Sequence, residues 1–135
     1  MKKLITAGVD EVGRGCLAGP VFSAAVILNN NINAKGIKDS KKISFKNRMI
    51  LSEYIKNNSI FAVGFASVEE INKLNILNAS LLSMKRALNK LKKKPSIIYI
   101  DGIFAPKNLK IKYKTFIKGD EKIISIAAAS IVAKA

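Results

Sequence analysis

The chain has 135 residues, of which 49% are hydrophobic and 24% are charged, and its 24 Lys and Arg residues against 9 Asp and Glu give a net charge of +15. This length suits one domain with a buried core, and the charge favours a polyanionic partner. A sequence with no histidine and one cysteine excludes Ser-His-Asp and Cys-His catalysis and zinc sites built on those residues. Acid–base chemistry must therefore use carboxylates, Lys, Tyr or metal-bound water.

The length of the apolar stretches and the number of cysteines indicate where in the cell the protein is located. The longest apolar stretches, 17–28 and 123–133, are shorter than the roughly 20 residues that a membrane helix needs. No targeting segment is evident, and the single Cys16 fits a reducing compartment. We therefore expect a cytoplasmic monomer with no membrane association. The lysine-rich composition also has a simpler explanation in an AT-rich coding sequence, so charge alone does not establish a nucleic-acid partner.

The chain opens with two apolar runs, 4–9 and 17–28, which flank a glycine-rich connection and predict a β-hairpin. The first run ends on two adjacent carboxylates, Asp10 and Glu11. Adjacent side chains in a strand point to opposite faces, so these two reach one site only if the strand ends between them. They are either the start of a Mg²⁺ or Mn²⁺ site or a solvated acidic turn.

The next part of the chain alternates loops with a helix and a strand. Polar residues at 29–33 and basic residues at 39–42 predict loops. Ser44 is a candidate N-cap for a helix that ends near Asn58. Residues 60–66 predict a strand, in which Gly64 is either a bulge or a point of close packing.

The clearest helix signal is at 75–92. Leucine and methionine recur there at alternating spacings of three and four, which draws one apolar stripe along a helix. Ser67 is expected to cap a short turn before this helix. Pro95 prevents the helix from continuing.

The last third of the sequence predicts two strands and a helix. The apolar run 97–100 is typical of a strand buried on both faces, and it ends on Asp101, either a second strand-end carboxylate of a site or a simple turn residue. Residues 112–117 predict a strand, and Asp120 is expected to cap an Ala- and Ile-rich helix over 121–134 that packs against the sheet. The whole order predicts an α/β fold, a mixed sheet with helices on its faces.

Five segments resemble, in order, the motifs of one enzyme family. They are GVDEVGRGCLAGPV (8–21), KDSKKIS (38–44), NILNAS (75–80), YIDG (99–102), and IKGD followed by SIAAASIVAK (117–134). On these motifs the chain is identified as a member of the prokaryotic type 2 ribonuclease H enzymes, ribonuclease HII. The resemblance covers essentially the whole chain. It implies a ribonuclease H-like mixed β-sheet flanked by helices, with the first strand in the centre beside the strand of Asp101.

The resemblance also implies a chemistry. It implies an endonuclease that degrades the RNA strand of RNA–DNA hybrids, incises DNA at embedded ribonucleotides, leaves 5′-phosphate ends and serves DNA replication and repair. The family holds two divalent cations, Mn²⁺ or Mg²⁺, on four carboxylates. Asp10, Glu11 and Asp101 match the first three of these catalytic metal ligands. The substrate-binding residues that it implies, a loop that reads the ribose 2′-hydroxyl and three phosphate contacts, are Gly13, Arg14, Gly15, Lys41, Lys42 and Lys118.

The fourth carboxylate has no counterpart in this chain. In the family, the helix matching 125–134 continues into a Thr-Arg-Asp segment whose Asp completes the cluster, and a later helical region contributes a tyrosine to junction recognition. We expect residues 1–135 to form a single ribonuclease H-like catalytic domain that lacks this C-terminal helical segment.

Three interpretations follow for a shortened chain. In the first, the sequence is part of an intact ribonuclease HII that is a metal-dependent endonuclease. In the second, the shortened protein keeps weak metal-dependent cleavage on three carboxylates. In the third, it is a non-catalytic binder of RNA–DNA hybrids or a decayed remnant. Without the resemblance, the alternative is a basic nucleic-acid-binding α/β module, although carboxylates at two strand ends would repel phosphate unless a cation lay between them.

Overall fold

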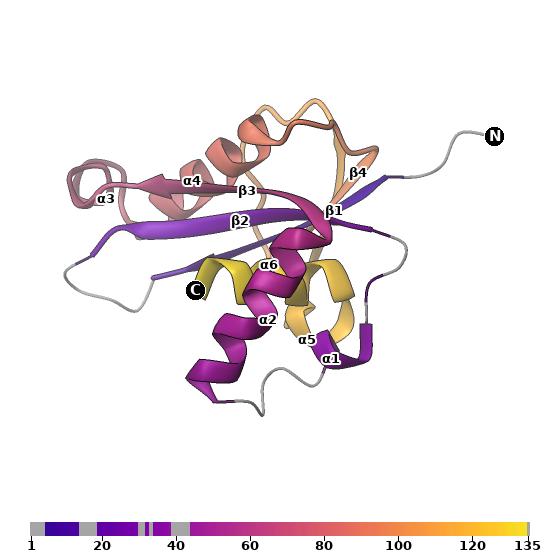
Figure 1. Cartoon of the computed structure of the whole chain (residues 1–135). Helices are drawn as coiled ribbons and strands as arrows, with labels where there is room; N and C mark the ends of the chain where they lie inside the picture. Colours follow the sequence, from indigo (N-terminus) through magenta and orange to yellow (C-terminus); the bar gives the residue numbers. More distant parts are fainter. Residues whose placement is uncertain (1–4, 14–18, 30–31, 33, 39–43, 135) are drawn as a thin grey trace.

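A mixed five-stranded sheet forms the middle layer of the structure, a computed structural model that describes residues 5–13, 19–29, 32, 34–38 and 44–134 (Figure 1). The strands lie in the order β3-β2-β1-β4-β5. The first three pair antiparallel, and β1–β4 and β4–β5 pair parallel. The expected α/β fold, with the first strand beside the strand of Asp101, is confirmed. The strand bounds are β1 Thr6–Val12, β2 Val21–Leu28, β3 Ser59–Ala66, β4 Ile97–Asp101 and β5 Lys112–Phe116.

Helices cover both faces of the sheet (Figure 1). One face carries α1 (Ala34–Lys38), α2 (Phe45–Asn57), α5 (Gly119–Lys122) and α6 (Ile124–Lys134), and the other carries α3 (Val68–Leu74) and α4 (Ile76–Lys90). We refer to these as the α6 face and the α4 face. Among the helices that the structure describes, none is long and apolar enough to cross a membrane.

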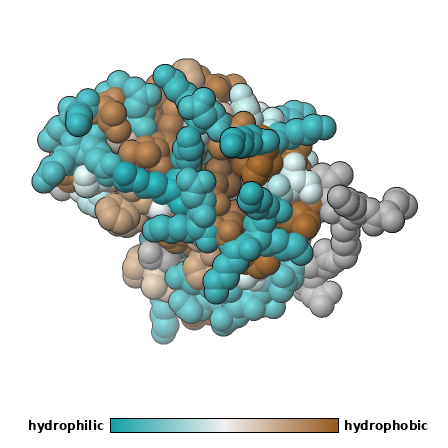
Figure 2. Space-filling model, turned by 90° about the horizontal axis from the view of Figure 1, so that it is seen from above, coloured by the Kyte–Doolittle hydropathy of each residue, from teal (hydrophilic) through white to brown (hydrophobic). Residues whose placement is uncertain are grey.

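The core has two parts, one on each side of the sheet. Every residue of α6 from Ser125 to Ala133 is buried, as expected for an Ala- and Ile-rich helix that packs on a sheet. On the α4 face, Val9, Ile98 and Ile100 pack with buried residues of α4. Figure 2 shows the molecule from this side, where hydrophilic residues surround patches of hydrophobic ones.

Two glycines bring helices into contact with the sheet backbone. A Cβ at Gly64 would overlap backbone atoms of Ser83 and Ala87 in α4, so the predicted close packing at Gly64 is confirmed. A Cβ at Gly8 would overlap the backbone of Ser125 and Ile126 in the same way, on the α6 face. These two positions fix how closely α4 and α6 approach the sheet.

The structure corrects the prediction for β4. Ile98 and Ile100 are fully buried on the α4 face, but Ile97 and Tyr99 are partly exposed on the other face. The strand is therefore not buried on both sides, because α6 packs mainly on β1 and β2. On its open face, Tyr99 makes an edge-on contact with Phe116 of β5, with ring centroids 5.3 Å apart.

The structure also corrects the prediction for the last helix. A single helix over 121–134 with Asp120 as its cap is wrong, because α5 begins at Gly119 with Lys118 in the N-cap position and has no side-chain cap. Extended backbone at Ile123 (φ −122°, ψ 121°) then separates α5 from α6. Asp120 therefore lies inside α5 and not ahead of it, and the first amide of α5, that of Gly119, donates to the Asp101 side chain.

The turn expected at Ser67 is a full helix, α3, with a capping box between Ser67 and Glu70. Glu70 also receives two hydrogen bonds from the Arg86 guanidinium, at 2.7 and 2.6 Å. These bonds lower the pKa of Glu70 from 4.5 to about 2. The stabilisation is therefore present above pH 4.5 and is lost as the pH falls towards 2.

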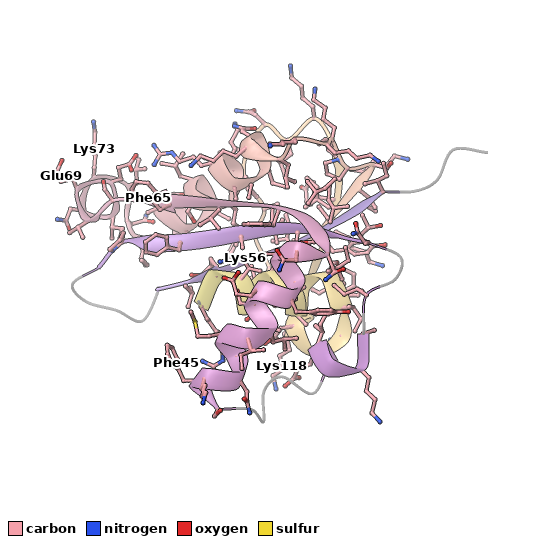
Figure 3. All side chains as sticks on the ribbon, in the orientation of Figure 1. Phe45, Lys56, Phe65, Glu69, Lys73 and Lys118 are labelled. Atoms are coloured by element: carbon pink, nitrogen blue, oxygen red, sulfur yellow. The ribbon has the colours of Figure 1, made fainter. Side chains whose placement is uncertain are left out.

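We predict that Glu70→Gln removes this acid-dependent contribution. Urea unfolding between pH 2 and 6 is expected to show a shallower loss of stability for Glu70→Gln than for the wild type. Glu69→Gln, at the neighbouring exposed position (Figure 3), is the matched control and should follow the wild type. Equal pH dependence in all three proteins would contradict the assigned role of the Arg86 contact.

Candidate functional site

Asp10 and Asp101 lie side by side on the α6 face of two parallel strands. Val9 of β1 pairs with Ile100 of β4, so the next residue along each strand is a carboxylate. Val9 and Ile100 both pack on the α4 face, and alternation then directs both carboxylates to the α6 face. The parallel register thus joins two residues that are distant in sequence into one acidic pair.

Hydrogen bonds hold both members of this pair. Asp10 accepts from the backbone N–H of Glu11, 2.8 Å from its Oδ1, and from the hydroxyl group of Ser130 in α6. Asp101 Oδ1 accepts from the backbone N–H of Gly119 at 2.7 Å, and the two carboxyl groups are themselves hydrogen-bonded. The α5–α6 segment therefore supplies one donor to each carboxyl group.

The environment of Asp10 disfavours its charged form. Its side chain is buried, with 7% of the residue exposed. Burial, and then the charge of Asp101, raise the pKa of Asp10 from 3.8 to about 8, and the hydrogen bonds from Glu11 and Ser130 partly oppose the shift. At neutral pH, Asp10 is therefore protonated unless another positive charge takes the place of the proton.

This pair fits a divalent cation. Carboxylate oxygens are the ligands that Mg²⁺ and Mn²⁺ prefer, and a cation between two crowded carboxylates removes the repulsion that raises the pKa of Asp10. Asp10 and Asp101 would be its ligands. Within the described part of the chain, however, no three His, Cys, Asp or Glu side chains gather closely enough to hold a metal ion.

Glu11 is the predicted ligand that the structure does not bring to this pair. The strand does not end between Asp10 and Glu11, because β1 continues through Val12. Alternation therefore directs the Cβ of Glu11 to the α4 face. A metal-binding role for Glu11 stays a prediction.

The predicted substrate-binding residues are placed only in part. Gly13 directly follows β1 and has a φ of 109°, a conformation that favours glycine. Lys118 is exposed, has a left-handed backbone (φ 52°, ψ 45°) and lies on the α6 side of the sheet (Figure 3). Four predicted residues lie outside the described residues, namely Arg14, Gly15, Lys41 and Lys42.

Sequence reasoning missed two residues that contact the acidic pair, Ser130 and Gly119. Both fall inside quoted motifs, SIAAASIVAK and IKGD. A serine in the middle of an otherwise Ala- and Ile-rich buried helix is a signal for Ser130, because a buried hydroxyl group needs a hydrogen-bond partner. Nothing in the sequence indicates that the Gly119 amide reaches Asp101.

The fold and the acidic pair define a class, the ribonuclease H-like enzymes. The solved structure of ribonuclease H2 from Pyrococcus horikoshii matches with a TM-score of 0.82 and 28% identity, over 97% of this chain and 71% of that chain. The structure of Bst-RNase HIII in complex with Mn²⁺ matches with a TM-score of 0.81 and 26% identity, over 97% of this chain and 51% of that one.

The family follows from closer similarity. The family described as Ribonuclease HII matches residues 7–135. Ribonuclease HII of Pelagibacter ubique is 61% identical over 132 residues, which cover 96% of this chain and 70% of that relative. Ribonuclease HII of Neisseria meningitidis serogroup B is 52% identical over 132 residues, 97% of this chain and 68% of that relative. The chain belongs to the ribonuclease HII family of ribonuclease H hydrolases.

Proposed function

We propose that this chain carries the catalytic site of an endonuclease that hydrolyses the RNA strand of RNA–DNA hybrids and incises DNA at embedded ribonucleotides. The observation that supports this most is the pairing of the buried Asp10 with the half-buried Asp101, whose crowding favours a divalent cation. Membership of the ribonuclease HII family supplies the substrate class.

The proposed cofactor is a pair of Mn²⁺ or Mg²⁺ ions. The chemistry that they supply is activation of the attacking water and neutralisation of charge on the leaving oxygen. Asp10 and Asp101 would provide ligands, and Glu11 is the other ligand proposed among these residues. A site of this kind hydrolyses a phosphodiester without histidine, of which the chain has none.

The proposed substrate contacts are the six residues that match the family's motifs. Gly13, Arg14 and Gly15 would read the ribose 2′-hydroxyl, the group that distinguishes RNA from DNA. The positive φ of Gly13, directly after β1, supports a tight turn there. Lys41, Lys42 and Lys118 would contact phosphates. The proposed setting is a cytoplasmic monomer acting in DNA replication and repair.

Two substitutions at Lys118 test whether its charge contacts a phosphate of the substrate. Lys118→Gly removes the charge and relieves a left-handed conformation that costs a residue with a side chain about 1 kcal/mol. We predict that it keeps or raises the unfolding temperature but weakens duplex binding, with the slope of log K against log salt reduced by about 0.9. Fluorescence anisotropy at several salt concentrations measures this slope. Lys118→Arg is the control with retained charge, and an unchanged slope in Lys118→Gly would exclude a phosphate contact.

Cleavage of a labelled DNA duplex that contains one ribonucleotide tests the proposed function. The chain is assayed with Mn²⁺, Mg²⁺ or EDTA, beside the same chain extended at its C-terminus by the corresponding segment of the Pelagibacter ubique relative. Cleavage on the 5′ side of the ribonucleotide by both proteins would show that the fourth carboxylate is dispensable. Cleavage by the extended protein alone would show that the site needs the added segment. If both proteins are folded and neither cuts, the proposed function is wrong.

A second candidate function is binding of RNA–DNA hybrids without cleavage. The observation that favours it is that no three carboxylates gather within the described residues. Hybrid binding that is unaffected by EDTA and by Asp10→Asn would support this candidate, whereas cation-dependent cleavage would exclude it.

A further inference from the structure

Ser130 is the one side chain of α6 that is shown to bond to the acidic pair in the described structure. It lies in the middle of a helix whose neighbouring residues are apolar and buried, and it is itself only 6% exposed. Its hydroxyl group donates a hydrogen bond to the Asp10 carboxyl group. Since a buried hydroxyl group without a partner is costly, this bond fixes the rotamer of Ser130 and the orientation of Asp10 together.

The packing of α6 on β1 sets the position of Ser130. Gly8 allows the backbone of Ser125 to contact the strand, and Ser130, further along the same helix, then lies over Asp10, further along the same strand. The helix therefore runs beside β1 in the same direction, with its hydroxyl group at the level of the carboxylate. A wider separation, which any side chain at position 8 would force, would remove this contact.

We propose that Ser130 is a positioning residue for the divalent cation: its hydroxyl group orients the Asp10 carboxylate towards Asp101 before the cation binds. The Gly119 amide plays the corresponding part for Asp101, at 2.7 Å from Oδ1. Residues that orient the ligands of a metal commonly change its affinity or the activity by about 10–100-fold when they are removed. This inference rests on the proposed function, because it assumes that the pair binds a cation.

Calorimetric titration of the metal-free chain with Mn²⁺ tests the proposal without requiring cleavage. Ser130→Ala is expected to raise the dissociation constant for Mn²⁺ by about 10–100-fold, and Ser130→Thr, which keeps the hydroxyl group, is expected to recover most of the affinity. Ser23→Ala is the matched control, because Ser23 is also fully buried but bonds to Ser83 on the α4 face. It should bind Mn²⁺ like the wild type.

Thermal unfolding without metal distinguishes positioning from a structural role. A structural role would lower the unfolding temperature of Ser130→Ala and leave the dissociation constant unchanged, and this result would overturn the proposal. An equal loss of Mn²⁺ affinity in Ser23→Ala would overturn it as well. A wild-type chain that binds no Mn²⁺ would instead overturn the proposed function, so the two failures are distinguishable.

Discussion

Asp10→Asn is expected to abolish cation-dependent cleavage and, at the same time, to stabilise the metal-free chain. Cleavage should fall by more than about a hundredfold, the upper end of the loss expected when only a group that orients a metal ligand is removed, because Asp10 is a proposed ligand itself. Stability should rise because asparagine removes an ionisable group from a buried site where ionisation is unfavourable.

The pH dependence gives the sign of this stability effect. The pKa of Asp10 is raised from 3.8 to about 8 in the folded chain, mainly by burial and then by the charge of Asp101. Because the folded chain binds this proton more tightly than the unfolded chain, Asp10 contributes stability that is fully present below pH 3.8. This contribution is lost as the pH rises through about 8. Without a cation the wild type should therefore lose stability between these limits, by on the order of a few kcal/mol, and Asp10→Asn should lose much less.

Urea unfolding of the EDTA-treated proteins between pH 4 and 9 measures this difference. Glu53→Gln is the control, since the Glu53 side chain is 66% exposed on α2, and it should keep both the activity and the pH dependence of the wild type. Added Mn²⁺ should stabilise the wild type at pH 8 by binding to the folded state alone. A metal-free Asp10→Asn chain that is less stable than the wild type at pH 8 would contradict the account of the acidic pair.

Gly8→Ala is expected to cause the largest loss of stability of any single methyl addition on the α6 face. The added Cβ would overlap the backbone of Ser125 and Ile126, and backbone atoms cannot turn aside as a flexible side chain can. We expect the free energy of unfolding to fall by about 3 kcal/mol or more. Because α6 must move away from β1, Ser130 should also lose its contact with Asp10, and Mn²⁺ binding should weaken in the molecules that remain folded.

Two further glycine variants control for this effect. Among the described residues, no atom beyond the chain neighbours lies within 4 Å of a Cβ built at Gly19, so Gly19→Ala should change stability little. Gly64→Ala presses on α4 instead and should lower stability while leaving Mn²⁺ affinity nearly unchanged. If Gly8→Ala were as stable as Gly19→Ala, the close contact between α6 and β1 would be excluded.

The sheet and the two aspartates near the ends of its strands are predictable from sequence because their signals are local. An apolar run that ends on Asp10, and another that ends on Asp101, each indicate a strand and a carboxylate near its end. The order of elements then indicates a mixed sheet. Because side chains alternate along a strand, the sequence also predicts correctly that Asp10 and Glu11 point to opposite faces unless the strand ends between them.

The contacts that complete the site depend on packing and are not local. At the start of α5 the Gly119 amide bonds to Asp101, a residue on another strand, and extended backbone at Ile123 ends this helix. The bond from Ser130 to Asp10 requires α6 to lie directly on Gly8. Neither periodicity nor composition within 119–134 indicates these partners. The two carboxylates can therefore be predicted from the sequence, but the Ser130 hydroxyl and the Gly119 amide that bond to them cannot.

In the proposed site, Asp10 and Asp101 hold a divalent cation together. The most direct test is Mn²⁺ binding, followed by electron paramagnetic resonance, in the wild type, Asp10→Asn, Asp101→Asn and the double variant. A shared site predicts that each single variant loses most of the affinity and that the double variant loses little more, because contacting residues do not act additively. Wild-type affinity in either single variant would show that the pair does not bind the cation.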